Sequence, residues 1–259
     1  MGHEALIGYS GFVGSHLARQ HSFSHYYRST DTHRIDGEHF DLVVCAGVSS
    51  AKWIANKDPT SDWKAIERLL VHLERVTATH FVLISTVDVY PIPIDVDEDT
   101  EPSESNHAYG HHRLSVERFV VERFQHRTII RLPGLFGTGL KKNILYDLLQ
   151  HRLLDQINPA SEFQYYDLSL LWSDVERIRH YGLPLVNIAT EPLSTGEIIE
   201  RYFRSVQTGA SPVAQVHYRV KTKYDRLFGG AQGYLYSKEI ILAHLGHFIH
   251  SYHHAPCCL

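Results

Sequence analysis

Residues Gly8-Tyr9-Ser10-Gly11-Phe12-Val13-Gly14 follow a short apolar run, Glu4–Ile7, and precede a stretch of helical character. Three glycines in the spacing GxxGxxG permit a tight turn and a close backbone approach. A helix that begins there presents free N–H groups and a partial positive charge at its amino end. The stretch therefore predicts a strand–turn–helix unit that binds a pyrophosphate, as dinucleotide-binding proteins do. The residues expected to line this site are Gly8, Ser10, Gly11, Phe12, Val13 and Gly14.

Strand and helix patterns alternate from this unit onward. Apolar runs typical of buried parallel strands cover residues 41–45, 80–84 and 128–130, and a weaker candidate strand covers residues 25–28. Apolar residues recur at helical spacing between the runs, at Trp63, Ile66, Leu70, Leu73 and Val76 and again at Val116, Val120 and Phe124. A polar, proline-containing segment over residues 91–106 is expected to be a loop. The alternation predicts an α/β fold, a doubly wound Rossmann-like parallel sheet with helices on both faces.

The pattern loosens after Gly139. The second half contains three helical patterns, one strand pattern and one helix capping box, at residues 141–150, 173–179, 237–248, 185–188 and 194–197. We therefore predict a dinucleotide-binding core over residues 1–140. Residues 141–259 are expected to form a small C-terminal substrate-binding lobe, interleaved with the core, to which some of its elements return.

The composition excludes several classes of protein. The 259 residues are 43% hydrophobic and 21% charged, which is typical of a folded globular chain. The formal net charge of −4 offers no basic excess, so we expect no nucleic-acid partner. No apolar run approaches the roughly 20 residues of a membrane span, so we expect no membrane contact. The first residues lack the pattern of a signal peptide, and three cysteines give no disulfide framework, which favours a reducing, cytoplasmic location.

The carboxyl-terminal tail combines His250, His253 and His254 with Cys257 and Cys258, residues that can bind zinc or nickel. Their spacing fits no compact site, because adjacent cysteines cannot easily share one tetrahedral ion. We therefore predict no metal site. Cys45 ends an apolar run and is expected to be a buried core thiol.

Two residues near the end of the expected second strand bear on the choice of dinucleotide. An acidic residue there would hydrogen-bond the adenosine ribose of NAD, whereas an arginine would suit the additional phosphate of NADP. The segment Arg28-Ser-Thr-Asp31 contains both residue types. Arg28 lies closer to the expected strand end, so NADP is favoured and NAD stays open.

Five segments resemble, in order and approximate spacing, the extended short-chain dehydrogenase/reductase family. They are Gly8–Gly14, Cys45-Ala-Gly47, Ser85-Thr-Val-Asp-Val-Tyr90, Tyr109-Gly-His-His-Arg113 and Arg131-Leu-Pro-Gly-Leu-Phe-Gly137. The similarity covers about residues 3–205. The resemblance implies an NAD(P)-dependent epimerase, dehydratase or reductase that acts on a nucleotide sugar. Because helix pairs of this family often build dimers, it also implies a homodimer as one option.

The resemblance further implies which residues carry the chemistry. Thr86 matches the family's catalytic hydroxyl, Tyr109 matches its tyrosine, and Arg113 stands where the family has lysine. Residues four apart share one helix face, and a cation beside a phenol lowers the pKa of the phenol. Tyr109 would then exchange a proton with a substrate oxygen. Tyr234 and Lys238 have the same spacing, but they lie beyond the half of the chain that builds the sheet.

The same resemblance places Tyr109, Arg113, Pro133, Ala46 and Gly47 against the cofactor. Dehydratases of the family have an acidic pair directly after the threonine, and here those positions hold Val87 and Asp88, which disfavours dehydration.

Arginine at position 113 supplies charge but releases no proton, so a relay through this residue is not expected. Two hypotheses remain, a nucleotide-sugar reductase or epimerase and a cofactor-binding protein without turnover, such as a redox-sensing regulator or a structural partner of an enzyme.

Overall fold

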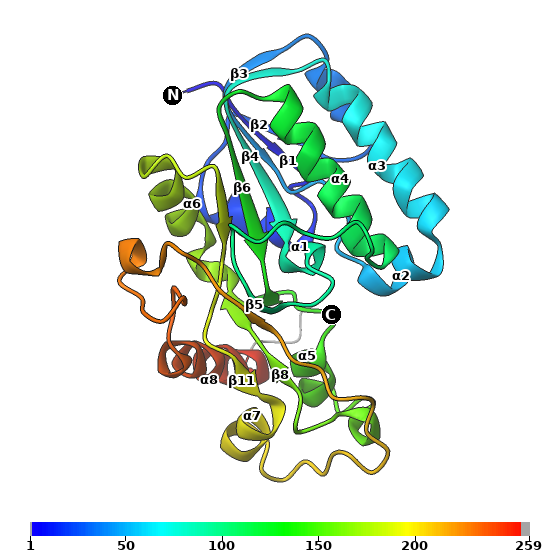
Figure 1. Cartoon of the computed structure of the whole chain (residues 1–259), viewed down its shortest axis with the longest axis vertical. Helices are drawn as coiled ribbons and strands as arrows, with labels where there is room; N and C mark the ends of the chain where they lie inside the picture. The colour runs from blue at the N-terminus through cyan, green and yellow to red at the C-terminus, as the bar shows by residue number, and fades with distance from the viewer. Residues whose placement is uncertain (1, 255–259) are drawn as a thin grey trace. The chain divides into compact units, whose positions relative to one another are not determined.

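The computed structural model describes residues 2–254, and side chains over residues 2–252 (Figure 1). The chain forms two compact units. The first contains residues 1–92, 98–132 and 169–187, and the second contains residues 93–97, 133–168 and 188–259. The chain thus passes from one unit to the other several times.

A parallel sheet of six strands, in the order β10-β6-β4-β3-β1-β2, forms the centre of the first unit. Its strands are β1 (Glu4–Ile7), β2 (His25–Tyr27), β3 (His39–Cys45), β4 (Thr77–Thr86), β6 (Arg127–Leu132) and β10 (Leu185–Asn187). Every pair of neighbours is parallel. The doubly wound, Rossmann-like sheet predicted from the sequence is confirmed, and the weaker candidate strand is present as the edge strand β2.

Helices cover both faces of this sheet. They are α1 (Phe12–Gln20), α2 (Lys52–Lys57), α3 (Pro59–Leu73), α4 (Ala108–Arg123) and α6 (Leu171–His180). Helices α3 and α4 pack together on one face, and α1 and α6 contact each other on the opposite face (Figure 1). Consecutive residues of β1, from Ala5 through Leu6 to Ile7, are all buried, as expected for a parallel sheet that is covered on both sides.

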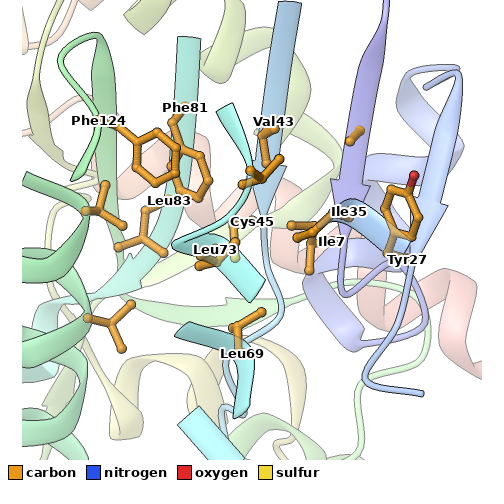
Figure 2. Packing of buried hydrophobic residues seen from close by; sticks show 14 of the residues in the cluster. Ile7, Tyr27, Ile35, Val43, Cys45, Leu69, Leu73, Phe81, Leu83 and Phe124 are labelled. Carbon is orange, nitrogen blue, oxygen red and sulfur yellow. The ribbon is translucent and has the colours of Figure 1, made fainter. Parts of the chain in front are cut away.

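The core beneath α3 and α4 is drawn in Figure 2. Side chains of the central strands pack against Leu69 and Leu73 of α3, and Phe81 of β4 stacks on Phe124 with ring centres 4.0 Å apart. Cys45 is fully buried, as predicted, and burial raises the pKa of its thiol to about 11.

Two details of the expected secondary structure differ in the structure: the end of α3 and the polar segment over residues 91–106. Helix α3 begins at Pro59, where the carboxylate of Asp58 accepts the N–H of Ser61. The helix ends at Leu73, earlier than the apolar spacing predicted. Val76, expected on the helix, is instead a buried residue immediately before β4. The segment expected to be a polar loop contains a short strand, β5 (Ile94–Val96).

Short strands and helices form the second unit. Its strands pair as β7 (Gly134–Phe136) with β9 (Tyr165–Asp167), β8 (Glu162–Phe163) with β11 (Leu193–Ser194), and β5 with β12 (Arg219–Val220). Its helices are α5 (Ile144–Leu149), α7 (Thr195–Tyr202) and α8 (Lys238–His254). The hydroxyl of Ser194 accepts the N–H of Glu197 at 3.1 Å, which confirms the expected helix cap.

Within the described part of the chain, no helix is both long enough and apolar enough to cross a membrane. Among the described side chains, no group of three histidine, cysteine or acidic residues is arranged to hold a metal ion. Cys257 and Cys258 lie outside the described residues, and the side chains of His253 and His254 are not described. The absence of a metal site therefore stays a prediction.

Candidate functional site

The glycine-rich turn joins β1 to α1 and has no room for side chains at two of its glycines. Gly8 has a φ of +86°, and a Cβ there would lie 2.4 Å from the carbonyl oxygen of Ala46. A Cβ on Gly14 would lie 2.1 Å from the carbonyl oxygen of Gly8. Both distances are shorter than any real contact, so the turn requires glycine at both positions.

The amino end of α1 is left open for an anion. Gly11 is the residue at the N-cap, and no described side chain caps the helix there. The first turn carries no acidic residue, and Ser10 is exposed beside it. The rings of Phe12 and His16 pack edge to face, and Val13 is half-buried. Free N–H groups and the helix dipole make such an end suitable for a phosphate group.

The loops after β1 and β3 meet at the point where the strand order reverses. The chain passes from β1 to β2 on one side and then to β3 on the other, and such a switch point opens a crevice at the carboxyl ends of the strands. The N–H of Ala46 donates to the carbonyl of Ile7 at 2.9 Å. The structure therefore brings Gly8, Ala46 and Gly47 together.

Arg28 lies at the same edge of the sheet. The N–H of Gly8 donates to the carbonyl of Tyr27 at 2.7 Å, so Arg28 begins beside the glycine turn. The Arg28 side chain is 56% exposed, and its nearest contact with Asp31 is a long one of 3.9 Å. The carboxylate of Asp31 instead accepts the backbone N–H of Arg28 at 2.6 Å. The guanidinium is therefore accessible to a ligand.

Tyr109 and Thr86 come together although 22 residues separate them. Thr86 ends β4 and Tyr109 lies in the first turn of α4, where its side chain is only 6% exposed. The hydroxyls of the two residues are hydrogen-bonded. The backbone N–H of Tyr109 donates to the side-chain oxygen of Asn56 in α2 at 2.9 Å, which fixes the start of the helix.

Local sequence explains why α4 begins against the end of β4. The ring nitrogen of His107 accepts the N–H of Gly110 at 3.0 Å and caps the helix. A Cβ on Gly110 would lie 2.2 Å from the carbonyl oxygen of Asp88, so glycine permits direct backbone packing. The amide of Asn106 donates to the carbonyls of Asp88 and Val89, both at 3.0 Å. Together these contacts hold Tyr109 beside Thr86.

Arg113 stacks on Tyr109 and is held by an acidic partner. Its guanidinium carbon lies 4.0 Å from the centre of the Tyr109 ring. Its two terminal nitrogens donate to the Asp62 carboxylate, at 2.5 Å from Nη1 and 3.1 Å from Nη2, and Nη2 also donates to the carbonyl of Ser49. Its Nε atom is buried and has no hydrogen-bond partner among the described residues. The carboxylate of Asp62 thus compensates the positive charge of Arg113.

The electrostatics of the site keep Tyr109 a neutral phenol. Burial raises the pKa of Tyr109 to about 12, and the neighbouring carboxylates Asp88 and Asp62 act in the same direction. Arg113 and the hydrogen bond from Thr86 lower the pKa, but they do not offset burial. Burial also raises the pKa of the Asp62 carboxyl, yet the hydrogen bonds and charges of Arg113 and His112 outweigh it and hold this pKa below its usual range.

Three residues near the tyrosine were not found from the sequence. Asp62 comes from α3, Asn56 and Lys52 come from α2, and the Lys52 ammonium donates to the Asp88 carboxylate at 2.8 Å. Each partner lies dozens of residues away from the residue it contacts, so no local spacing marks the pair. A buried arginine requires a carboxylate, but the sequence offers 29 acidic residues and does not say which one.

A second buried ion pair connects α4 to the sheet. Arg131 of β6 pairs with Glu117 of α4 through both nitrogens of a fork, with the shortest distance at 2.6 Å, and both side chains are 4% exposed. The hydroxyl of Ser85, next to Thr86, donates to the other oxygen of Glu117 at 2.5 Å. Arg131 also donates to the hydroxyl of Tyr90 at 2.6 Å. This network ties α4 to the end of β4.

Pro133 follows β6 directly and is the first residue of a segment that belongs to the second unit. Its predicted contact with a cofactor therefore stays a prediction.

No protein-family model and no curated protein sequence matches the chain. Solved structures do match its fold. A dTDP-4-dehydrorhamnose reductase from Bacillus anthracis, in complex with NADP, is 16% identical over 97% of this chain and 100% of its own, with a TM-score of 0.72.

Two further solved structures are similar. A UDP-glucose 4-epimerase from Thermotoga maritima with UDP-glucose is 14% identical over 97% of this chain and 98% of its own, with a TM-score of 0.72. A dTDP-glucose 4,6-dehydratase from Streptomyces venezuelae, with NAD bound, is 14% identical over 97% of both chains, with a TM-score of 0.75. The chain has the same fold as these enzymes, which confirms the fold that the resemblance implied.

Proposed function

We propose that this protein is an NAD(P)-dependent reductase or epimerase that acts on a nucleotide-activated sugar, with Tyr109 as the general acid or base. The observation that carries the proposal is the hydrogen-bonded pair of Thr86 and Tyr109, which lies at the end of a central strand of a doubly wound sheet. In such sheets ligands bind at the carboxyl ends of the strands. The three similar structures described above are all enzymes of nucleotide sugars.

The glycine turn fits a dinucleotide. The uncapped amino end of α1, from Gly11 to Gly14, would hold its diphosphate, and Ala46 and Gly47 would lie on the adenine side. The exposed guanidinium of Arg28 suits a 2′-phosphate, which favours NADP over NAD. When bound, the coenzyme gives a hydride to the reacting carbon of the substrate or takes one from it.

Tyr109 would move the proton. In a reduction its hydroxyl donates a proton to the carbonyl oxygen of the substrate, and in an oxidation its phenolate accepts one. Thr86 would donate a hydrogen bond to the same substrate oxygen. Arg113 would give electrostatic support and would not relay a proton, because arginine does not deprotonate in proteins.

We propose that the second unit binds the nucleotide sugar. The similarity to the UDP-glucose 4-epimerase extends over 97% of this chain and so includes this unit. A homodimer, the absence of a nucleic-acid partner and a cytoplasmic location stay predictions.

One observation favours a second candidate, a cofactor-binding protein without turnover. Both terminal nitrogens of Arg113 already donate to Asp62 or Ser49, which makes them less available to a ligand. Such a protein would be a redox-sensing regulator or a structural partner of an enzyme.

The test begins with fluorescence titrations of the purified protein with NADPH and NADH. Consumption of reduced coenzyme is then measured with a panel of 4-keto sugar nucleotides, for the wild type and Tyr109→Phe. Tyr181→Phe, at an exposed tyrosine, is the matched control. Turnover that disappears only in Tyr109→Phe supports an enzyme, and binding without turnover supports the second candidate. No binding of either coenzyme at millimolar concentration overturns both.

A further inference from the structure

Asp62 is the common partner of Arg113 and His112, two side chains of α4. Its carboxylate accepts both terminal nitrogens of Arg113, and its Oδ2 atom lies 2.8 Å from the Nδ1 atom of His112. The Asp62 side chain is 8% exposed and that of Arg113 is 4% exposed, so solvent screens the interaction weakly. A carboxylate so placed compensates the guanidinium where it faces the phenol ring.

This arrangement differs in its effect from an unpaired cation. An uncompensated cation near a buried phenol stabilises the phenolate and prepares it to accept a proton. A carboxylate that pairs with the cation weakens this effect, so the cation does not offset the burial that keeps the proton on the ring. The planar guanidinium still stacks on the ring and fixes its orientation.

We propose that Asp62 is a positioning residue that holds Arg113 against the ring of Tyr109 and compensates its charge, so that Tyr109 acts as a proton donor and the substrate is a carbonyl compound. This inference rests on the proposed function and deepens it, because it favours a reductase over an epimerase, which must also withdraw a proton from an alcohol.

The balance of the step is that of a carbonyl reduction. The π bond between carbon and oxygen breaks, a C–H bond forms with the hydride of a reduced nicotinamide coenzyme, and an O–H bond forms with the proton of Tyr109. The carbonyl is reduced and the coenzyme is oxidised. Water then returns a proton to the phenolate of Tyr109.

The other charged groups around Tyr109 leave this conclusion intact. Asp88, after β4, disfavours the phenolate, and it is itself paired with Lys52 of α2. The ring of His107, which precedes α4, lies 6.3 Å from the Tyr109 ring. Burial and the charge of Lys52 lower the pKa of His107, so this ring favours its neutral form.

The experiment follows the ionisation of Tyr109 directly, without coenzyme or substrate. Tyrosines are isotopically labelled at the ring carbon Cζ, their NMR signals are followed as the pH rises, and Tyr109→Phe identifies the signal of Tyr109. In the wild type we expect this signal to remain that of a neutral phenol to at least pH ~10. Ionisation of Tyr109 below pH ~9 overturns the proposal, and this result needs no other variant.

Asp62→Asn then tests the role of the carboxylate, and Asp62→Ser, which leaves room for water beside the guanidinium, replaces it if the first variant does not fold. Both release the charge of Arg113, so the midpoint of the Tyr109 titration should fall below that of the wild type. Asp62→Glu keeps the charge and should titrate like the wild type. An unchanged midpoint in a folded Asp62→Asn or Asp62→Ser variant overturns the role of Asp62.

A pH profile provides a second readout. The rate of reduction should be independent of pH between about 6 and about 9, whereas the rate of the reverse oxidation should rise about tenfold per pH unit. An oxidation rate that levels off below pH ~9 contradicts the inference. If the protein does not bind NADPH, the proposed function fails while the NMR result for Tyr109 and Asp62 still stands.

Discussion

The guanidinium of Arg113 lies over the ring of Tyr109, 4.0 Å from its centre, while the hydroxyl of Tyr109 is hydrogen-bonded to Thr86. The two contacts have different roles. Thr86 holds the oxygen that handles the proton, and Arg113 holds the ring. Asp62 completes the arrangement because a buried arginine without a carboxylate would be strongly unfavourable.

Arg113→Lys tests whether the site is adapted to arginine. An ammonium cannot reproduce the two-nitrogen contact with Asp62 together with the contact to Ser49, so we expect a loss of about 2 kcal/mol in the free energy of unfolding. Coenzyme affinity should stay within about tenfold, and turnover should not fall. Chemical denaturation, titration with NADPH and steady-state rates measure the three quantities.

Arg118 lies on the same helix as Arg113 and forms an exposed pair with Glu104, which precedes the helix, so Arg118→Lys is the control and should leave all three unchanged. A large loss of turnover in Arg113→Lys would show that the chemistry itself depends on arginine.

Glu117→Gln removes the charge that compensates Arg131 between α4 and β6. Breaking a buried ion pair leaves an unpaired charge, and we expect a loss of about 3 kcal/mol or more in the free energy of unfolding. Thermal and urea denaturation measure it. Glu104→Gln, in the exposed pair with Arg118, is the control and should show no measurable change. Equal effects of the two substitutions would contradict the importance of burial.

Gly8→Ala separates backbone strain from steric clash. Gly8 and Gly37 have nearly the same φ, +86° and +82°, but a Cβ would collide with Ala46 only at Gly8, since nothing lies within 4 Å of a Cβ at Gly37. We expect Gly37→Ala to cost about 1 kcal/mol through its backbone conformation alone. Gly8→Ala should cost distinctly more and abolish binding of NADPH, which calorimetric titration detects. If Gly8→Ala binds NADPH as well as the wild type does, the glycine turn is not part of the coenzyme site.

His80 should make stability decrease in acid. Partial burial, with the charges of Arg179 and His126, lowers the pKa of His80 from 6.5 to about 4, and its ring lies 3.0 Å from the hydroxyl of Thr128. The unfolded chain binds a proton at this residue before the folded chain does. Stability is therefore complete above pH 6.5 and decreases as the pH falls toward about 4.

His80→Asn should flatten the dependence of the unfolding free energy on pH in this window. Urea denaturation at a series of pH values measures the slope, and an identical slope in both proteins would refute the assignment to His80.

Arg28→Ala tests the choice of coenzyme. Loss of the exposed guanidinium should weaken binding of NADPH about tenfold and leave NADH binding unchanged, because only NADPH carries the additional phosphate. Arg34→Ala, at a neighbouring exposed arginine, is the control. Equal losses for both coenzymes would mean that Arg28 does not contact that phosphate.

The sequence predicted much of the fold because the relevant signals are local. The glycine spacing from Gly8 to Gly14 and the apolar runs of β1, β3, β4 and β6 each specify one element through nearby residues. Boundaries were less accurate: the helical spacing continued to Val76, but α3 ends at Leu73. The spacing of Tyr109 and Arg113 was likewise visible, and it placed both residues on one helix.

The sequence by itself determined the strand–turn–helix unit, the alternation that builds a doubly wound sheet, and the type of residue at each candidate position. Only the tertiary structure decided that Asp62 compensates Arg113 and that Lys52 pairs with Asp88. The physical reason is that periodicity and turn preference depend on neighbours along the chain. The charge and proton affinity of a buried group depend instead on whichever distant side chains the packing brings within a few ångströms.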